Sequence, residues 1–271
     1  ISAMLLKSGP FGILLLRFVL AQGASGEAAQ ALDTAMYVGA WIGGVTILYA
    51  GVQALLQTGI KEMLIYSTVS QLGYVVLGIC LGTSLGVSGG LLHLCNHMFF
   101  QDLAFLCAGA LMFASHAHNL EELGGMGRKM PITFLCFGAA LFSAAGMPPF
   151  NGFNSKLIIY YALIERGELV LAIIAILSSV ITLAYFLKFL HGAFFGQLTP
   201  AAERASEVGP AMRQPIVILA ALSLITGVVP GLALMPIAGL EQGLGLTPPL
   251  VRLSGIVSGY GASNMTLLSF M

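Results

Sequence analysis

A lysine follows two adjacent prolines inside an apolar stretch that is long enough to cross a bilayer. Residues 139–162 read AALFSAAGMPPFNGFNSKLIIYYA, with Pro148 and Pro149 near the middle and Lys156 seven residues further on. Two prolines in a row remove two backbone donors and clash with the preceding turn, so the helix is predicted to break there. The carbonyl groups freed by such a break cannot face lipid and must be buried against protein or line a wet cavity.

The position of Lys156 suggests a chemical role for its amine. The lysine falls in the first turns of the second half-helix, where the positive end of the helix dipole disfavours a charged ammonium, as burial also does. Ionisable groups are rare inside membranes and most often serve transport. We therefore expect Lys156 to take part in proton transfer. The alternative is a proline kink whose lysine extends to the membrane surface.

A second group of polar residues forms a stripe within residues 86–114. His93, His97 and Gln101 recur at intervals of four, so they share one helical face over about 12 Å. Asp102 lies one position round from this stripe. Histidine titrates near neutral pH and can pass a proton through either ring nitrogen, which favours a proton relay. Hydrogen bonding between helices is one alternative, and a metal site, for which only Asp102 offers a third ligand, is the other.

Two further lysines lie in apolar segments. Lys7 is close to Gly9 and Pro10, which again places a lysine beside a weak point in a helix, although a lysine at a frayed chain start is the alternative. Lys188 comes late in its segment and is expected to extend to the membrane surface.

The composition indicates a polytopic helical membrane protein. Of the 271 residues, 58% are hydrophobic and 8% are charged, the mean hydropathy is +0.94, and the net charge is zero. Soluble domains carry about 25% charged residues, and the charge balance excludes nucleic acid as an expected partner. Seven membrane segments are predicted, near residues 1–20, 35–56, 62–82, 86–114, 131–164, 168–195 and 214–238.

Cofactor motifs are missing from this sequence. The four cysteines have no CxxC spacing and are expected to be buried thiols, and no haem-ligand pair or iron–sulfur cysteine set is recognisable. The glycine-rich residues 124–127 follow no strand and precede no Lys-Ser/Thr pair, which excludes a phosphate loop. We therefore expect neither a cofactor nor a metal. The chain opens without methionine inside an apolar run, as expected of part of a larger protein or of a subunit whose other half is a separate chain.

Six motifs in order resemble one family, and together they extend to about Gly196. They are ISAMLLKSGPFGILLLRF, KEMLIYSTVSQLGYVVLG, LLHLCNHMFFQDLAFLCAGAL, LEELGGMGRKMPIT, AAGMPPFNGFNSKLII and TLAYFLKFLHGAFFG. The chain resembles the antiporter-like subunits of respiratory complex I, of Mrp-type sodium/proton antiporters and of energy-converting membrane-bound hydrogenases. Members of this family have fourteen helices with two inverted five-helix repeats, and this chain resembles helices eight to fourteen, the C-terminal half.

The resemblance implies a role for each matching residue. Lys7 matches the bridging lysine of helix eight, and His93 and His97 match the histidines of the central axis. Lys156 matches the lysine of the broken helix that many members use as the terminal proton donor or acceptor. Many members have lysine where this chain has Gln101, so one relay position lacks its titrating group. Asp102 could substitute, although it is displaced by about 100° around the helix.

The predicted fold is all-α, a membrane bundle of about seven transmembrane helices with at least one broken helix. Residues 1–30 are expected to hold the last helix of the first repeat and its loop. Residues 31–196 should form a five-helix repeat with its break near 148–155, and residues 197–271 the final transmembrane helix and a tail. The helix-five glutamate and helix-seven lysine of the family would have to come from another chain or from upstream sequence.

The predicted function is ion translocation. We expect a proton-translocating subunit of a multisubunit redox-driven complex, with sodium exchange as a variant and with catalysis of the redox reaction in other chains. A non-pumping structural subunit and a stand-alone secondary cation/proton antiporter are the alternatives. The expected partners are the lipid bilayer and other membrane subunits, one of which supplies the missing N-terminal half. The expected location is the prokaryotic inner (cytoplasmic) membrane, ahead of an organellar inner membrane.

Overall fold

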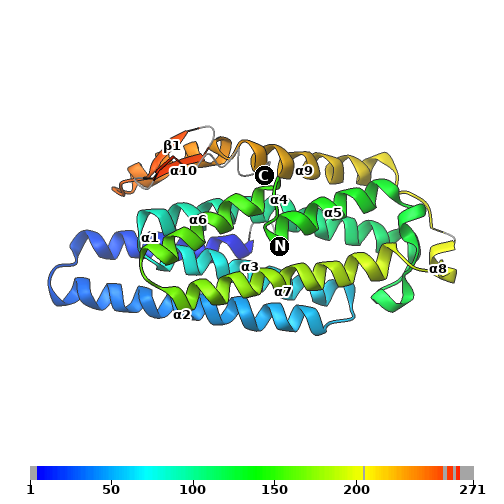
Figure 1. Ribbon diagram of the computed structural model, residues 1–271, viewed down its shortest axis with the longest axis horizontal. Helices are drawn as coiled ribbons and strands as arrows, with labels where there is room; N and C mark the ends of the chain where they lie inside the picture. Colours follow the sequence, from blue (N-terminus) through cyan, green and yellow to red (C-terminus); the bar gives the residue numbers. More distant parts are fainter. Residues whose placement is uncertain (1–4, 204, 253–254, 259–260, 263–271) are drawn as a thin grey trace.

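The protein is an elongated bundle of helices that run roughly along one axis (Figure 1). The computed structural model describes residues 5–203, 205–252, 255–258 and 261–262. The α-helices of this part are α1 (Ser8–Gly23), α2 (Glu27–Leu56), α3 (Ile60–Cys80), α4 (Ser84–Ser115), α5 (Pro131–Ala145), α6 (Asn151–Glu165), α7 (Leu169–Phe194), α8 (Pro200–Glu203), α9 (Pro210–Val228) and α10 (Gly231–Gly243). Short 3-10 turns add η1 (Leu5–Lys7), η2 (Leu120–Glu122) and η3 (Met126–Arg128).

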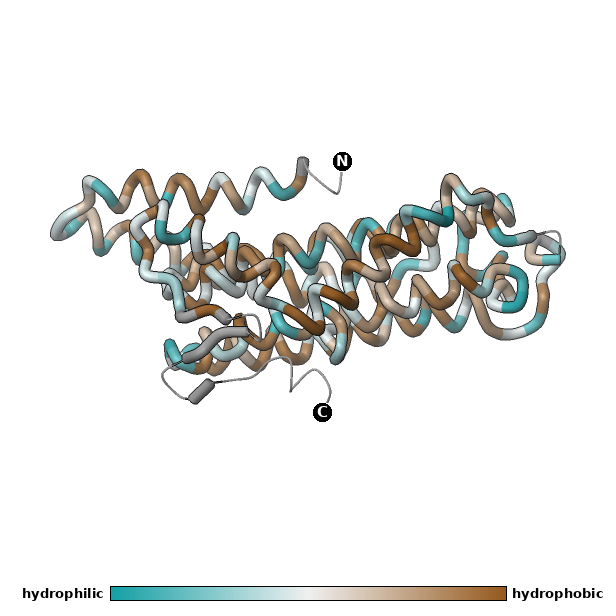
Figure 2. Tube along the Cα trace, turned by 90° about the horizontal axis from the view of Figure 1, so that it is seen from above, coloured by the Kyte–Doolittle hydropathy of each residue, from teal (hydrophilic) through white to brown (hydrophobic). Residues whose placement is uncertain are grey.

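Five of these helices, α2, α3, α4, α7 and α9, are long and apolar enough to cross a membrane, and α1 and α5 are shorter apolar helices. Hydrophobic residues cover most of the length of the bundle, while hydrophilic residues gather toward its two ends (Figure 2). Large apolar side chains such as Ile42, Tyr49, Ile176 and Val180 are exposed on α2 and α7. Because an exposed apolar flank is stable against lipid tails and costly in water, the prediction of a helical membrane bundle is confirmed.

The predicted break divides one segment into α5 and α6. Helix α5 ends at Ala145, Gly146 takes a positive φ of 81°, and α6 begins at Asn151 after the cis peptide bond between Pro148 and Pro149. The left-handed conformation at Gly146 is one that residues with a Cβ rarely adopt. Its amide donates to the carbonyls of Phe142 and Ser143. The fold therefore contains the broken helix that the sequence predicts.

The last predicted segment differs from a single helix. Residues 214–238 were expected to form one span, but α9 ends at Val228 and α10 starts at Gly231, with Pro230 between them. Proline cannot donate to the preceding turn, which accounts for the interruption. Beyond α10, strands β1 (Leu250–Arg252), β2 (Gly255–Ser258) and β3 (Gly261–Ala262) form a small antiparallel sheet in the order β1-β2-β3.

Helix α4 is at the centre of the bundle. It packs against α3, α5, α6, α9 and α10, whereas α7 covers α2, α5 and α6 from the other side (Figure 1). The polar stripe of α4 therefore faces protein along its whole length. This position satisfies the requirement that polar groups inside a membrane avoid lipid.

Lys188 binds backbone at the end of a neighbouring helix. Its Nζ donates to the carbonyls of Leu55 and Gln57, both at 2.8 Å, so the side chain caps the C-terminus of α2. The last carbonyls of a helix have no partner within the helix, and a lysine there also complements the helix dipole. Lys188 thus makes a structural contact between α7 and the end of α2, and its extension to the membrane surface stays a prediction.

Removing this contact should lower stability and leave the interior intact. Replacement of Lys188 by alanine is expected to lower the free energy of unfolding by about 1–3 kcal/mol, the usual effect of losing hydrogen bonds to a charged donor. Thermal unfolding of the detergent-solubilised protein measures it. Lys61→Ala is the control, because Lys61 is exposed and makes none of the recorded contacts. An equal midpoint for Lys188→Ala and Lys61→Ala would contradict the proposed capping role.

Candidate functional site

Lys156 is buried beside the helix break. Its side chain is 1% exposed, and Nζ donates to the carbonyl of Ala144 at 2.8 Å and to Oγ of Ser179 at 3.1 Å. The amine also lies 4.5 Å from the centre of the Tyr74 ring. Ala144 is in the last turn of α5, where carbonyls have no partner within the helix. The break therefore supplies the acceptor for the lysine, and among the described residues Lys156 forms no ion pair.

A cluster of hydroxyl groups extends from Lys156 toward the side of the bundle. Ser179 on α7 bonds the hydroxyl of Tyr160 at 2.6 Å and that of Tyr74 at 3.0 Å, and Tyr74 donates to the carbonyl of Ala175 at 2.5 Å. Tyr74 is fully buried, whereas Ser179 and Tyr160 are half-buried. These residues were not predicted from the sequence, because serines and tyrosines are common in apolar helices and nothing in their spacing marks them.

His93 connects the broken helix to α3 and is completely buried. Its Nδ1 lies 2.9 Å from Oγ of Ser155, the residue next to Lys156, and its Nε2 lies 3.2 Å from Oε1 of Gln71. In a neutral ring one nitrogen donates and the other accepts, so Nε2 donates to the amide oxygen of Gln71 and Nδ1 accepts from the hydroxyl of Ser155. Gln71 continues to Thr182 on α7 at 3.4 Å.

His97 is also completely buried, but neither of its ring nitrogens has a hydrogen-bond partner among the described residues. The ring meets Phe100 edge to face, with centroids 5.4 Å apart. Asn96 Oδ1, Asn154 Oδ1 and Ser223 Oγ, from α4, α6 and α9, are likewise buried without a partner. Buried polar atoms of this kind are normally satisfied by bound water. The interior around the break is therefore suited to hydration.

Gln101 is held by the neighbouring helix α3. Its Nε2 donates to the carbonyl of Leu64 at 3.1 Å, and Oε1 lies 3.5 Å from Oγ of Ser67. Ser67 in turn bonds the hydroxyl of Tyr185 at 2.8 Å. A carbonyl and a hydroxyl thus contact the end of this side chain, and a second hydroxyl bonds the first, which is an environment that an ammonium group could also occupy.

We therefore expect the Gln101→Lys variant to assemble normally and to keep the predicted ion-translocation activity. The new ammonium would donate to the Leu64 carbonyl and to the hydroxyls of Ser67 and Tyr185. Quantifying the assembled protein in membranes tests this. Phe100→Lys, at a fully buried apolar position next to it, is the control and should lose assembly, because an unpaired buried charge costs several kcal/mol. Failure of both variants would indicate a dry contact that cannot accept a charge.

Lys7 and Asp102 are brought to the same region of the bundle. The side chain of Lys7 is 6% exposed and that of Asp102 is half-buried. Lys7 is close enough to interact electrostatically with Asp102 and with His97. His93 in turn interacts electrostatically with both His97 and Lys156, so these titratable residues follow one another through the bundle from Lys7 to Lys156.

No group of three histidine, cysteine or acidic side chains that could hold a metal ion occurs among the described residues. Both nitrogens of His93 already contact protein side chains. The spacing of His93 and His97 therefore does not form a metal site with any third ligand in this part of the chain.

The chain is similar to known membrane proteins. The family model described as "NADH:quinone oxidoreductase/Mrp antiporter, TM" matches residues 1–182. NADH-quinone oxidoreductase subunit N of Desulforudis audaxviator is 32% identical over 189 residues, which are 69% of this chain and 38% of that protein. F(420)H(2) dehydrogenase subunit L of Methanosarcina mazei is 36% identical over 209 residues, 72% of this chain and 31% of that protein.

The similarity extends to solved structures. A chain of the membrane-bound sulfane sulfur reductase, an archaeal respiratory membrane complex, superposes with a TM-score of 0.88 at 32% sequence identity. The alignment covers 99% of this chain and 44% of that one. This chain thus spans about a third of the length of the two curated relatives and less than half of the structural one.

Proposed function

The chain belongs to the NADH:quinone oxidoreductase/Mrp antiporter transmembrane family, and from this premise we propose that it conducts protons along its buried polar axis. One observation carries the proposal. Lys156, buried at a helix break without an ion-pair partner among the described residues, is one residue from Ser155, whose hydroxyl contacts His93. A titratable amine and a titratable imidazole thus lie next to each other in the middle of an apolar bundle.

The chemistry of each group fits transfer in steps. His93 can accept and release a proton at Nδ1, on the side of Ser155 and Lys156, while its Nε2 donates to the amide oxygen of Gln71 and keeps the ring in place. His97, whose ring nitrogens have no partner in the described part of the chain, would exchange protons through bound water. Lys7 and Asp102 would form the section of the path beyond His97, and Gln101 would position water through its amide.

The helix break positions Lys156 so that its side chain can be accommodated either as an ammonium or as a neutral amine. As an ammonium, Lys156 donates to the carbonyl of Ala144 and to Ser179. As a neutral amine, it needs fewer acceptors and can itself accept a hydrogen bond. Because the carbonyl is available only where α5 ends, Pro148 and Pro149 act indirectly, by ending the helix at this depth.

We infer that the chain works within a larger assembly. Two of its relatives are named as subunits of redox complexes and another as a Na(+)/H(+) antiporter subunit, and the chain spans only part of their length. Other membrane subunits or upstream sequence would supply the N-terminal half next to Lys7. The redox reaction would take place in other subunits, with protons as the coupling ion or with sodium in exchange. Such a complex would lie in the inner (cytoplasmic) membrane of a prokaryote.

A structural role without transport is the second candidate. The observation in its favour is the pairing of Gln101 with Leu64 and Ser67, which resembles an ordinary contact between helices. A stand-alone antiporter is the third. Affinity purification under mild detergent separates this last candidate from the others: redox subunits should copurify with the chain, and a chain that purifies alone with full ion exchange activity would contradict the complex.

A further inference from the structure

A second buried ionisable side chain lies outside the axis described above. Glu241, near the end of α10, is 0% exposed. Both of its carboxyl oxygens contact one group, Oγ of Ser88 on α4, at 2.7 Å and 3.0 Å. Among the described residues, no ion pair and no other side-chain hydrogen bond to this carboxyl is recorded.

These contacts favour the neutral acid. A carboxylate in a protein interior is normally stabilised by several donors or a positive charge, but Ser88 has a single hydroxyl hydrogen to offer two oxygens. A neutral carboxylic acid needs fewer hydrogen-bond donors around it. Its own O–H can donate to Oγ of Ser88, or its carbonyl oxygen can accept from the Ser88 hydroxyl. A buried carboxyl with one hydroxyl partner is thus a site that holds a proton and can release it.

The surroundings of Glu241 are apolar. Leu234 and Ile237, on the same face of α10, belong to one hydrophobic cluster with Leu92 and Ile158 of α4 and α6. Among the described residues, few charged or titratable side chains lie on the elements that neighbour Glu241. Besides the histidines and Asp102, α4 presents Cys95, which packs against this cluster, and α1 presents Arg17 across a cavity.

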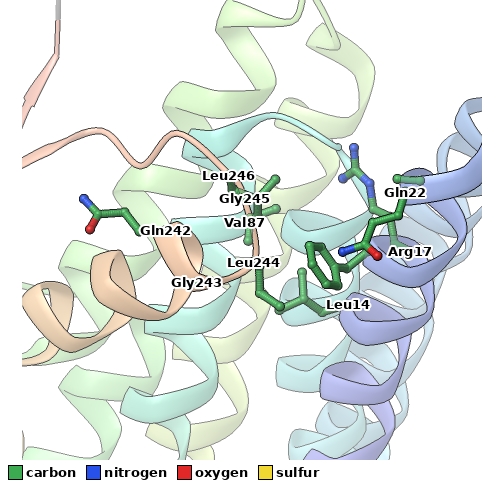
Figure 3. Close-up of a pocket in the computed structure, with 11 residues that line it drawn as sticks. Leu14, Arg17, Gln22, Val87, Gln242, Gly243, Leu244, Gly245 and Leu246 are labelled. Atoms are coloured by element: carbon green, nitrogen blue, oxygen red, sulfur yellow. The ribbon is translucent and has the colours of Figure 1, made fainter.

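A cavity lies at the same end of α10, although neither Glu241 nor Ser88 lines it. It has a volume of about 510 Å³ between α1, the start of α4 and the end of α10, and its wall includes Val87 and Gln242, the neighbours of Ser88 and Glu241. Figure 3 shows Arg17 and Gln22 of α1 on one side and Gln242 and Gly243 of α10 on the other. Its size and the polar side chains of Arg17 and Gln22 on α1 allow it to hold water. Glu241 is therefore adjacent in sequence to the residues of α10 that line this hydratable space.

The other side of the carboxyl faces the helices of the axis. Ser88 precedes His93 by five residues on α4, which corresponds to about 7.5 Å along the helix. Leu92 is one turn from Ser88, and Ile158 is one turn from Ser155, the partner of His93. Because both belong to the apolar cluster that Leu234 and Ile237 of α10 join, we take these two side chains as the layer between Glu241 and the axis.

We propose that Glu241 is a further proton-binding site, which exchanges protons with water in the cavity beside Arg17 and forms the end station of the axis across the layer of Leu92 and Ile158. The second half of this statement rests on the proposed function of the axis. The first half, proton binding and exchange at Glu241, is independent of it.

Infrared spectroscopy of the assembled complex tests proton binding directly. The wild type should show the carbonyl band of a protonated carboxyl that shifts in D₂O and is missing in Glu241→Gln. Ser88→Ala, which keeps the acid and removes its partner, should move the band without removing it. If Glu241→Gln keeps every carboxyl band of the wild type, or if the band never shifts in D₂O, proton binding and exchange at Glu241 would be contradicted.

Two glycines of α10 provide a matched test of the route. A Cβ at Gly243 or at Gly239 meets nothing within 4 Å, so both positions accept a larger side chain, but only Gly243 lines the cavity. Gly243→Leu should slow hydrogen–deuterium exchange of the Glu241 carboxyl severalfold, and Gly239→Leu should leave it unchanged. Equal exchange in the two variants would contradict access through the cavity.

Transport by Glu241→Gln then tests the link to the axis. We expect a severalfold loss of proton translocation, with assembly retained. Wild-type translocation in Glu241→Gln, alongside its loss in Lys156→Ala, would disconnect Glu241 from the axis and leave the proposed function standing. Wild-type translocation in Lys156→Ala would instead contradict the proposed function of the axis. The exchange measurements would in that case still test proton binding at Glu241.

Discussion

Replacing Lys156 by alanine should reduce proton translocation to the level of the membrane leak while the complex still assembles. Alanine removes the titratable amine but not the break, because Pro148 and Pro149 still end the first half-helix. It also removes a buried group that costs solvation energy, so folding should tolerate the change better than a new buried charge. Dye-reported proton uptake by vesicles that contain the purified complex measures the effect per assembled complex.

Lys188→Ala is the control for this experiment. Both lysines donate to backbone carbonyls at a helix end, but Lys188 does so at the end of α2, away from the hydroxyl cluster and from His93. Its loss should lower stability and leave translocation per assembled complex near the wild-type value. Equal losses of transport in the two variants would indicate that Lys156 has only a structural role.

His93→Gln should lower proton translocation by about tenfold or more, given that a positioned histidine accelerates proton transfer by roughly 10²–10⁴-fold in enzymes. Glutamine can replace both contacts of the ring, to Ser155 and to Gln71, through its amide nitrogen and oxygen. It cannot titrate near neutral pH. The variant therefore separates proton transfer from hydrogen bonding between helices.

The comparison variant for His93→Gln is His93→Ala, which loses both functions and should assemble less well. The amount of assembled complex and its transport rate are measured together for the pair. Wild-type transport in His93→Gln, with loss only in His93→Ala, would show that the ring holds α3, α4 and α6 together and carries no proton.

The helical architecture and the break were predictable because they follow from local rules. Apolar stretches of sufficient length define membrane helices, and Pro148 followed by Pro149 cannot continue one. The stripe of His93, His97 and Gln101 was visible because a period of four residues places side chains on one face. The burial of all three follows from the cost of exposing polar groups to lipid.

The partners of these residues could not be predicted in the same way. Gln71, Tyr74 and Ser179 reach the axis from α3 and α7, and their positions depend on how the helices pack. The capping role of Lys188 depends on the end of α2, which is distant in sequence. The division between α9 and α10 had a visible signal in Pro230, but the hydropathy pattern alone favoured one continuous helix.

The ratio of protons moved to electrons transferred tests the central proposal most directly. It is measured in vesicles that contain the assembled complex, with the redox reaction and proton uptake followed in the same sample, for the wild type and for Lys156→Ala. The axis described above predicts that this ratio falls in Lys156→Ala relative to the wild type. An unchanged ratio in Lys156→Ala would contradict it.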